Sequence, residues 1–331
     1  MPNFSVEPLS PNEKILTDAA GRKLLLYNGK EPKSSAARNC DLAVKIPLTR
    51  TIACTPIQLA FALRLEKEAG GGVLDKFAGI LNAAEAHLVL PELMERMRNG
   101  KLRDIRSISE LRAAKPDISF AFLWTREDPQ LVNILEHLKL PYVVTDAWYE
   151  SSFLDRIRWM EFIAHFFNLE NKAHEIIARI SEEIEAIKTL SKRTSTNPKV
   201  LWFVDFQDFV YVTGGRSWPA QSVADLGGNV ITPEPNSSGS VDSSRDWVAD
   251  HMSEADVIVF TMVRPTIAHI SQLYPKVNET PAFKNKKVFG FSLEYWQEST
   301  YAPELWYTEL SNILRPTPMV QELRVFVQAR M

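Results

Sequence analysis

A run of residues near the middle of the chain, 151–191, contains neither glycine nor proline. Apolar residues recur in its second half with the spacing of one helix face: Ala173, Ile176, Ile177, Ile180, Ile184, Ile187 and Leu190. A helix over 170–191 would be roughly 33 Å long at 1.5 Å per residue. That length is enough to join two lobes, so the run predicts a single long, rigid inter-lobe helix.

Short apolar runs alternate with helical segments on both sides of this helix. The strand candidates are 50–54, 77–80, 117–124, 141–149, 199–206, 209–214, 256–261 and 286–292. Strands that alternate with helices of this length imply a parallel sheet covered on both faces, and continuously apolar strands agree with burial on both sides. The fold class is therefore predicted to be α/β, with two Rossmann-like lobes that contain parallel-type sheets.

The domain boundaries follow from this pattern. We expect an N-terminal α/β lobe over 1–169, a backbone helix over 170–191 and a C-terminal α/β lobe over 192–331. The first 43 residues are polar and broken by proline, glycine and serine. Within them, Ile15–Tyr27 reads as a hairpin with its turn at Ala20-Gly21, and 28–39 reads as a loop.

Composition excludes several classes of protein. The 331 residues are 45% hydrophobic and 24% charged, which is ordinary for a globular protein. The net charge is −3, and no basic stripe of the kind that binds nucleic acid is visible. The longest clean apolar runs have the length of strands, so no membrane span is expected.

The two cysteines, Cys40 and Cys54, do not form a disulfide framework or a metal knuckle. A single disulfide and two unpaired thiols both remain open. The N-terminal segment MPNFSVEPLSPNEK has no basic region followed by an apolar stretch, so we expect no signal peptide in this chain.

The sequence offers no enzyme signature. It contains no GxGxxG, Walker loop, HExxH or GxSxG, and its six histidines are scattered without ligand spacing. We therefore predict no catalytic residue and no metal-ligating residue.

Aromatic and basic residues gather where the predicted strands end. Ligands bind beyond the carboxyl ends of the strands in open parallel sheets, so these residues are the candidate ligand site: Thr55, Trp124, Arg126, Trp148, Tyr149, Phe206, Tyr211, Arg216, Trp218, Arg264, Tyr295 and Trp296. A cleft lined by aromatic faces and a few guanidinium groups suits a large, partly apolar, anionic ligand. The alternative is that about half of the aromatic residues are core packing.

Several segments together resemble a known family. They are LTDAAGR (16–22), IPLTRTIACTP (46–56), SISELRAAKPDISFAF (107–122), GGNVITP (227–233), PAFKNKKVFGFS (281–292) and PELWYTELSNILRP (303–316). In this order the chain is similar to the ABC-transporter substrate-binding proteins that carry ferric siderophores, haem or cobalamin. The fold that the resemblance implies, two α/β lobes joined by one long helix, is also the one predicted from the residues.

The resemblance gives two surface acids a role. In this family one acid on each lobe docks into arginine pockets of the membrane permease, and the matching positions here are Glu110 and Asp246. The rival interpretation is that an acid at the start of a helix only stabilises the helix dipole. Two departures from the family are the polar insert at 28–43 and the absence of a secretion signal or lipoprotein cysteine.

The resemblance thus implies the binding component of an ABC importer, located in the periplasm or at the cell surface as a lipoprotein. It would hold a metal chelate in the inter-lobe cleft as cargo, without a resident cofactor, and would deliver it to the permease and its ATPase. It would touch the membrane only through a lipid anchor or the permease. Haem would require an axial ligand, which Tyr149 or Tyr211 could provide. The alternatives are a chelatase-type enzyme that acts on a tetrapyrrole and a cytoplasmic metal-chelate carrier.

Overall fold

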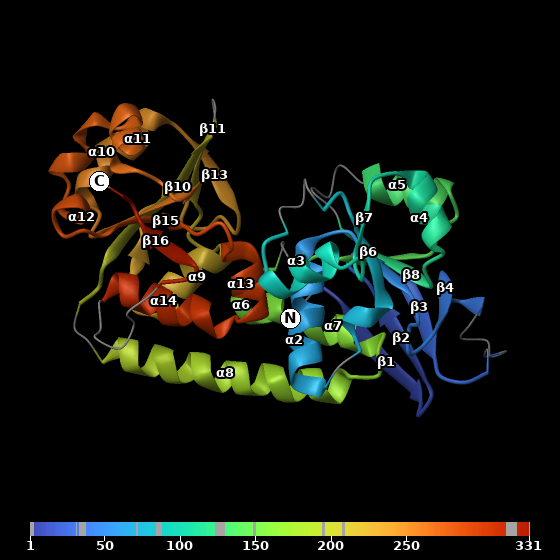
Figure 1. Ribbon diagram of the computed structural model, residues 1–331. Coiled ribbons are helices and arrows are strands. Elements are labelled where there is room, and N and C mark those ends of the chain that lie inside the picture. Colours follow the sequence, from blue (N-terminus) through green and yellow to red (C-terminus); the bar gives the residue numbers. More distant parts are fainter. Residues whose placement is uncertain are drawn as a thin grey trace. The chain divides into compact units, whose positions relative to one another are not determined.

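The computed structural model describes residues 3–30, 32, 38–70, 72–83, 88–122, 130–147, 150–193, 196–206, 209–315 and 323–330. The chain divides into unit 1, Met1–Glu150 with Leu154–Ala178, and unit 2, Ser151–Phe153 with Arg179–Met331. Helix α8 (Glu170–Lys192) begins in unit 1 and ends in unit 2 (Figure 1). The predicted long helix is therefore present. The alternation of strands and helices in both units confirms the predicted α/β fold class.

Unit 1 is built on a five-stranded, fully parallel sheet in the order β7-β6-β5-β8-β9. Its strands are β5 (Thr51–Ala53), β6 (Phe77–Leu81), β7 (Arg103–Ile105), β8 (Ile118–Phe122) and β9 (Tyr142–Thr145). Its helices are α2 (Pro56–Ala69), η1 (Leu74–Lys76), α3 (Pro91–Arg98), α4 (Ile108–Ala114), α5 (Gln130–His137), α6 (Phe153–Ile157) and α7 (Trp159–His165), although Phe153 itself belongs to unit 2. The chain starts at the centre of the sheet, adds β6 and β7 on one side, and then adds β8 and β9 on the other.

Helices cover both faces of this sheet, as the apolar strands predict. On one face, Leu111 of α4 and Leu135 of α5 pack against Ile52 and Val144. On the other face, Phe120 stacks on Phe77 at 5.9 Å, and α7 lies beside α2 (Figure 1).

A second sheet occupies the N-terminal part of unit 1. It contains β1 (Ser5–Ser10), β2 (Glu13–Thr17), β3 (Lys23–Tyr27) and β4 (Leu42–Lys45) in that order. Strands β2 and β3 form the predicted hairpin, with Thr17 opposite Lys23. The buried carboxylate of Asp18 accepts hydrogen bonds from the N–H groups of Ala20, Arg22 and Val144, and so fixes the turn to β9. Strands β1 and β4 were not predicted, and β4 shows that the polar insert ends in a strand.

Unit 2 contains a mixed sheet in the order β13-β11-β10-β14-β15-β16, and β12 pairs with the start of β10. The strands are β10 (Lys199–Phe206), β11 (Phe209–Thr213), β12 (Asn229–Val230), β13 (Ser240–Ser243), β14 (Val257–Val263), β15 (Val288–Phe291) and β16 (Phe326–Gln328). Strands β12, β10, β14 and β15 run parallel to one another, whereas β11 pairs with β10, and β16 with β15, in the antiparallel direction. The parallel centre agrees with the prediction, and β11 lies in the predicted strand 209–214, but its antiparallel direction and the strand β16 were not predicted.

Both faces of this mixed sheet are also covered (Figure 1). The helices of unit 2 are α9 (Trp218–Asp225), α10 (Arg245–His251), η2 (Met252–Glu254), α11 (Ile267–Leu273), η3 (Pro275–Glu279), α12 (Pro281–Lys284), α13 (Tyr295–Tyr301) and α14 (Glu304–Leu314). Val248 of α10 and Ile270 of α11 pack on one face, against Phe203 and Phe260. Trp306 of α14 packs on the other face, 5.8 Å from Trp202.

Candidate functional site

The carboxyl edge of the five-stranded sheet in unit 1 has a switch point between β5 and β8, where the direction of strand addition reverses. Open α/β sheets bind ligands at such a point. Thr55 follows β5 and is the N-cap residue of α2. The structure therefore places Thr55, one of the predicted site residues, at the switch point of unit 1.

Gln58 organises this switch point and was missed by the sequence reasoning. Its side chain is buried, and its Oε1 accepts hydrogen bonds from the N–H groups of Cys54 (2.7 Å) and Thr55 (3.1 Å). Its Nε2 donates to the Ala121 carbonyl at 3.2 Å and to Thr145 Oγ1 at 2.8 Å. One amide thus ties together the ends of β5, β8 and β9. The Thr-Pro-Ile-Gln spacing is that of a capping box and could have indicated this residue.

The remaining predicted site residues of unit 1 cannot be placed. Trp124, Arg126, Trp148 and Tyr149 lie outside the described residues. Their assignment to the ligand site stays a prediction.

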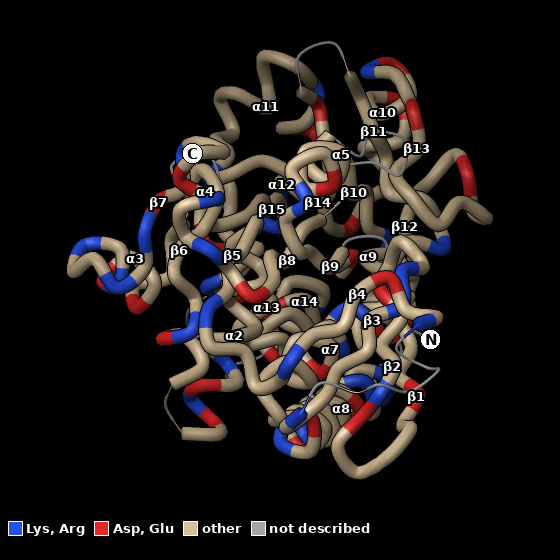
Figure 2. The backbone as a smooth tube through the Cα atoms, turned by 90° about the vertical axis from the view of Figure 1, so that its right-hand side faces the viewer, with Lys and Arg blue, Asp and Glu red and all other residues tan. Residues whose placement is uncertain are grey.

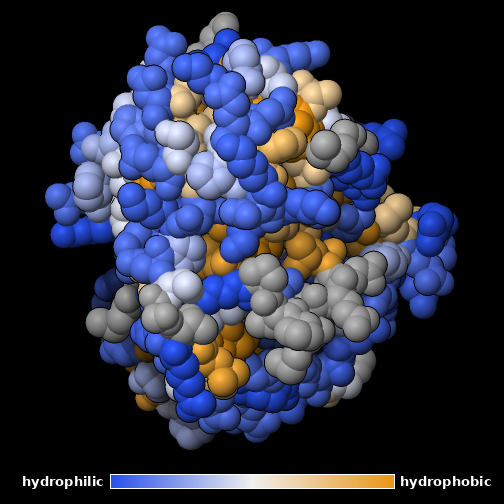
Figure 3. Space-filling model, turned by 90° about the vertical axis from the view of Figure 1, so that its left-hand side faces the viewer, coloured by the Kyte–Doolittle hydropathy of each residue, from blue (hydrophilic) through white to orange (hydrophobic). Residues whose placement is uncertain are grey.

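The carboxyl edge of the sheet in unit 2 exposes large apolar side chains. Strands β10, β14 and β15 run in parallel, so their carboxyl ends meet at one edge. The exposed residues at or just beyond these ends are Phe206 (64%), Phe209 (56%), Met262 (38%), Val263 (41%) and Leu293 (45%). Of these residues, Phe206 belongs to the predicted ligand site. Figure 3 shows that apolar residues gather in patches on a largely hydrophilic surface.

Three further predicted residues lie at the same edge. Arg264 follows β14 with a left-handed backbone (φ 50°), and its N–H donates to the Phe291 carbonyl at 2.8 Å. Tyr295 stacks on Phe291 with ring centroids 4.3 Å apart, and Trp296 lies 4.7 Å from Tyr295. Positive φ is an uncommon conformation for a non-glycine residue, and such residues cluster at functional sites.

Arg216 and Trp218 were predicted to lie beyond the carboxyl end of a parallel strand, and this prediction is wrong. Only residues 207–208 separate β10 from β11, so the two strands form an antiparallel pair and β11 ends away from the carboxyl edge of β10. Trp218 packs 4.7 Å from Trp306 and 5.9 Å from Phe153, whereas Arg216 is exposed. Tyr211 lies within β11 and stacks on Phe209 with ring centroids 6.3 Å apart.

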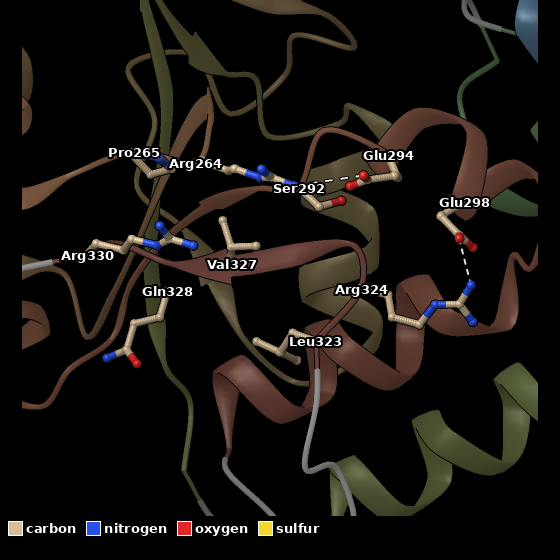
Figure 4. Close-up of a pocket in the computed structure, with 10 residues that line it drawn as sticks. All are labelled: Arg264, Pro265, Ser292, Glu294, Glu298, Leu323, Arg324, Val327, Gln328 and Arg330. Carbon is tan, nitrogen blue, oxygen red and sulfur yellow. Dashed lines mark hydrogen bonds and ion pairs between the residues drawn. The ribbon is translucent and has the colours of Figure 1, made fainter. Parts of the chain in front are cut away.

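A cavity of about 380 Å³ opens beside Arg264 (Figure 4). It is lined by Arg264, Pro265, Ser292, Glu294, Glu298, Leu323, Arg324, Val327, Gln328 and Arg330. Arg324 forms an ion pair with Glu298 at 2.6 Å, and Arg264 lies 3.8 Å from Glu294. Pro265 in this wall packs closely on Gly290, where a Cβ atom would lie only 2.4 Å from Pro265 Cδ, so the close approach requires a glycine.

The two predicted docking acids are exposed, but they occupy different helical positions. Glu110 is the third residue of α4, and its carboxylate accepts a hydrogen bond from the N–H group of Arg106 at 2.7 Å. Asp246 is the second residue of α10. The preceding residue, Arg245, forms an ion pair with Asp205 at 2.8 Å, which anchors the first turn of α10 to β10. The Arg245–Asp205 pair was not predicted.

The surface carries charged residues of both signs. Figure 2 shows Lys, Arg, Asp and Glu interspersed over the face that it displays. Cys40 and Cys54 are both free thiols, and burial raises the pKa of Cys54. Within the described part of the chain, no group of three or more histidine, cysteine or acidic residues could hold a metal ion. No described helix is both long and apolar enough to span a bilayer.

Comparisons with known proteins agree with this architecture. An uncharacterised lipoprotein of Methanocaldococcus jannaschii is 24% identical over 315 residues, which cover 92% of this chain and 75% of that protein. The crystal structure of a possible iron-binding, periplasmic solute-binding protein of Staphylococcus epidermidis has a TM-score of 0.64 at 15% identity, over 81% of this chain and 99% of that one. A periplasmic haem-binding protein of Pseudomonas aeruginosa has a TM-score of 0.63 at 13% identity, over 86% and 100% of the two chains.

These structural similarities show a shared fold. A family model described as periplasmic binding protein matches residues 69–292, which include most of unit 1 and the parallel centre of the sheet in unit 2. The chain therefore belongs to the periplasmic binding protein family.

Proposed function

We propose that this chain is the extracytoplasmic substrate-binding component of an ABC importer and that its cargo is a metal chelate, namely a ferric siderophore, haem or cobalamin. The observation that carries the proposal is the set of exposed apolar side chains at the carboxyl edge of unit 2, led by Phe206 and Phe209. Exposed apolar surface that is gathered in one place marks a binding surface. Such a surface suits a ligand with large apolar faces, and Arg264 at the same edge would offset negative charge on it.

The comparisons support the class of cargo and the partner. The two similar crystal structures are of a possible iron-binding protein and a haem-binding protein. Members of the family bind solutes, are extracytoplasmic and do not act as enzymes. We therefore propose an ABC permease with its ATPase as the partner, and no resident cofactor. The lipoprotein from Methanocaldococcus jannaschii supports a lipid anchor as the means of attachment to the membrane.

A thermal-shift panel tests the cargo. The protein is heated with haem, cobalamin or a set of ferric siderophores, while visible absorbance follows the chelate. A ligand at 100 times its dissociation constant should add about 2.7 kcal/mol to the free energy of unfolding. No shift with any chelate would overturn the metal-chelate proposal.

A pair of variants tests the surface that binds it. Phe206→Ala should weaken binding of the chelate by about tenfold or more, because a large aromatic contact is removed. Leu190→Ala is the matched control, since Leu190 is 56% exposed on α8 and precedes the amino end of β10. Equal affinities of the two variants would contradict the assignment of this edge.

A further inference from the structure

We propose that the cavity beside β16 binds a small hydroxycarboxylate, with Arg264 and Arg330 binding its carboxylate and Ser292 and Glu298 binding its hydroxyl group. This site goes beyond the proposed chelate cargo. It shares Arg264 with the exposed edge of unit 2, but its other walls come from β16 and α13.

The charges around the cavity favour an anion. Three arginines and two glutamates line it, so its net charge is positive. Glu298 neutralises Arg324 at 2.6 Å with a side chain that is 9% exposed. Arg264 has only a 3.8 Å contact with Glu294, in which both side chains are partly exposed, so that contact is weak. Arg330 has no ion pair among the described residues. Two guanidinium groups therefore remain for a carboxylate.

Two buried polar atoms in the cavity wall have no hydrogen-bond partner within the described structure. They are Ser292 Oγ and Glu298 Oε2, in residues that are 5% and 7% exposed. A buried polar atom without a partner is costly, and its presence calls for a ligand, an ion or a water. A hydroxyl group can accept a hydrogen bond from Ser292 and donate one to Glu298.

Ser292 Oγ and Glu298 Oε2 would make the cavity select a hydroxycarboxylate over other anions. Inorganic phosphate as its dianion brings negative charge but little donor capacity, so it would repel the carboxylate of Glu298. An amino acid would bring an ammonium group, but Arg324 already neutralises Glu298. A neutral donor next to a carboxylate satisfies both the arginines and the unpartnered atoms.

The cavity is also preorganised on its β16 side. The N–H group of Arg330 donates to the Pro265 carbonyl at 3.1 Å, and its carbonyl accepts from the Ile267 N–H at 2.7 Å. Figure 4 shows the Arg330 guanidinium directed toward Val327, and the Arg264 side chain extended past Ser292 toward Glu294. Because the backbone that carries Arg330 is fixed, less ordering is required when an anion binds.

Titration of the full chain with malate and with succinate at constant ionic strength tests the site, since succinate lacks only the hydroxyl group. We expect malate to bind at least about tenfold more tightly, because a hydrogen bond to a charged group is worth about that factor. Ser292→Ala should bring the affinity for malate close to that for succinate. It should not lower the melting temperature of the free protein, because the removed hydroxyl has no partner. Equal binding of the two acids, no binding at millimolar concentrations, or an unchanged preference in Ser292→Ala would overturn the proposal.

A second pair of variants tests the carboxylate contact. Arg330→Gln should weaken both acids by about tenfold. Arg193→Gln, which removes the same charge from an exposed residue just after α8, should weaken neither. Equal effects of these two variants would mean that only the net charge attracts the acids. If a chelate stabilises the protein while malate does not bind, the hydroxycarboxylate site is refuted and the chelate cargo is not. If malate binds while no chelate stabilises the protein, the chelate cargo is refuted and the hydroxycarboxylate site is not.

Discussion

Glu309 lies on α14 with 1% of its surface exposed, yet it is fully hydrogen-bonded. Its carboxylate accepts from three successive backbone N–H groups, those of Arg324, Val325 and Phe326, at 2.7–3.0 Å. Burial raises the pKa of this carboxyl group, and the three N–H groups oppose that effect. Successive N–H groups form a concave site for an anion. Here a side chain of the protein fills the site and holds the segment that leads into β16.

Replacing Glu309 should therefore destabilise the folded protein. Glu309→Ala should lower the free energy of unfolding by about 3 kcal/mol or more, since buried N–H groups lose their acceptor at about 1–3 kcal/mol each. Glu309→Gln keeps one carbonyl oxygen and should cost less. Urea denaturation measures both, with the exposed Glu182 on α8 as the control, where Glu182→Ala should stay within about 0.5 kcal/mol of wild type. A Glu309→Ala variant as stable as the control would refute this role.

The types of the site residues could be read from the sequence, but not the directions in which they point. Arg264, Tyr295 and Phe206 lie where the strand-end rule places them. Trp218 has the same chemistry, but it packs against Trp306 because the strand before it runs the other way. Met262 lies near the end of β14 and Leu293 just beyond β15, and both were missed because an aliphatic residue in or beside a strand looks like core in the sequence.

The end of α7, strand β2 and the start of α8 meet in one cluster. Lys14 Nζ lies 3.3 Å from Nδ1 of the buried His165 and also contacts the carboxylate of Glu170. Burial and the positive charge of Lys14 lower the pKa of His165 to about 4, while Glu170 opposes them. The imidazole is therefore neutral in the folded protein at neutral pH.

This cluster predicts a loss of stability in mild acid. Between pH 6.5, the ordinary pKa of histidine, and about 4, the unfolded chain binds a proton that the folded protein does not. The free energy of unfolding should fall as the pH falls through this window, by up to about 1.4 kcal/mol per pH unit. Urea denaturation at several pH values measures the slope. His165→Gln should flatten it, whereas His174→Gln on the exposed face of α8 is the control for loss of one imidazole. A slope that His165→Gln leaves unchanged would exclude His165 as its source.

Most elements could be predicted, but not how all of the strands pair. The apolar runs predicted β5, β6, β8, β9, β10, β11, β14 and β15, and helical spacing predicted α8. Strand β13 has the sequence Ser-Val-Asp-Ser and lies at a sheet edge, so it has no buried apolar pattern to find. Strand β16 pairs with β15 across more than thirty residues of chain. No local pattern encodes such a pairing.

Each unit presents an exposed acid, Glu110 or Asp246, at the carboxyl edge of its own sheet. Helix α4 follows β7, which is parallel to its neighbours. Helix α10 follows β13, which runs in the same direction as β10 because β11 is antiparallel to both. The first turns that carry Glu110 and Asp246 therefore begin at the edge that also carries the candidate ligand residues of the same unit. A permease that contacts these edges would meet the acids and the cargo on one side of each unit.

Substitution of Glu110 can separate docking from helix capping. If Glu110 docks as proposed, Glu110→Lys should leave the affinity for the chelate unchanged and abolish uptake in cells, because a cation would replace the acid that is proposed to meet arginines of the permease. It should also lose up to about 1 kcal/mol of stability, since the acid favours the start of α4. Glu110→Gln keeps an acceptor for the Arg106 N–H and removes only the charge, so it should retain stability and still impair uptake. Glu182→Lys on α8 controls for the added positive charge. If Glu110→Gln supports uptake as well as wild type, or if Glu110→Lys loses its affinity for the chelate, Glu110 caps its helix and does not dock.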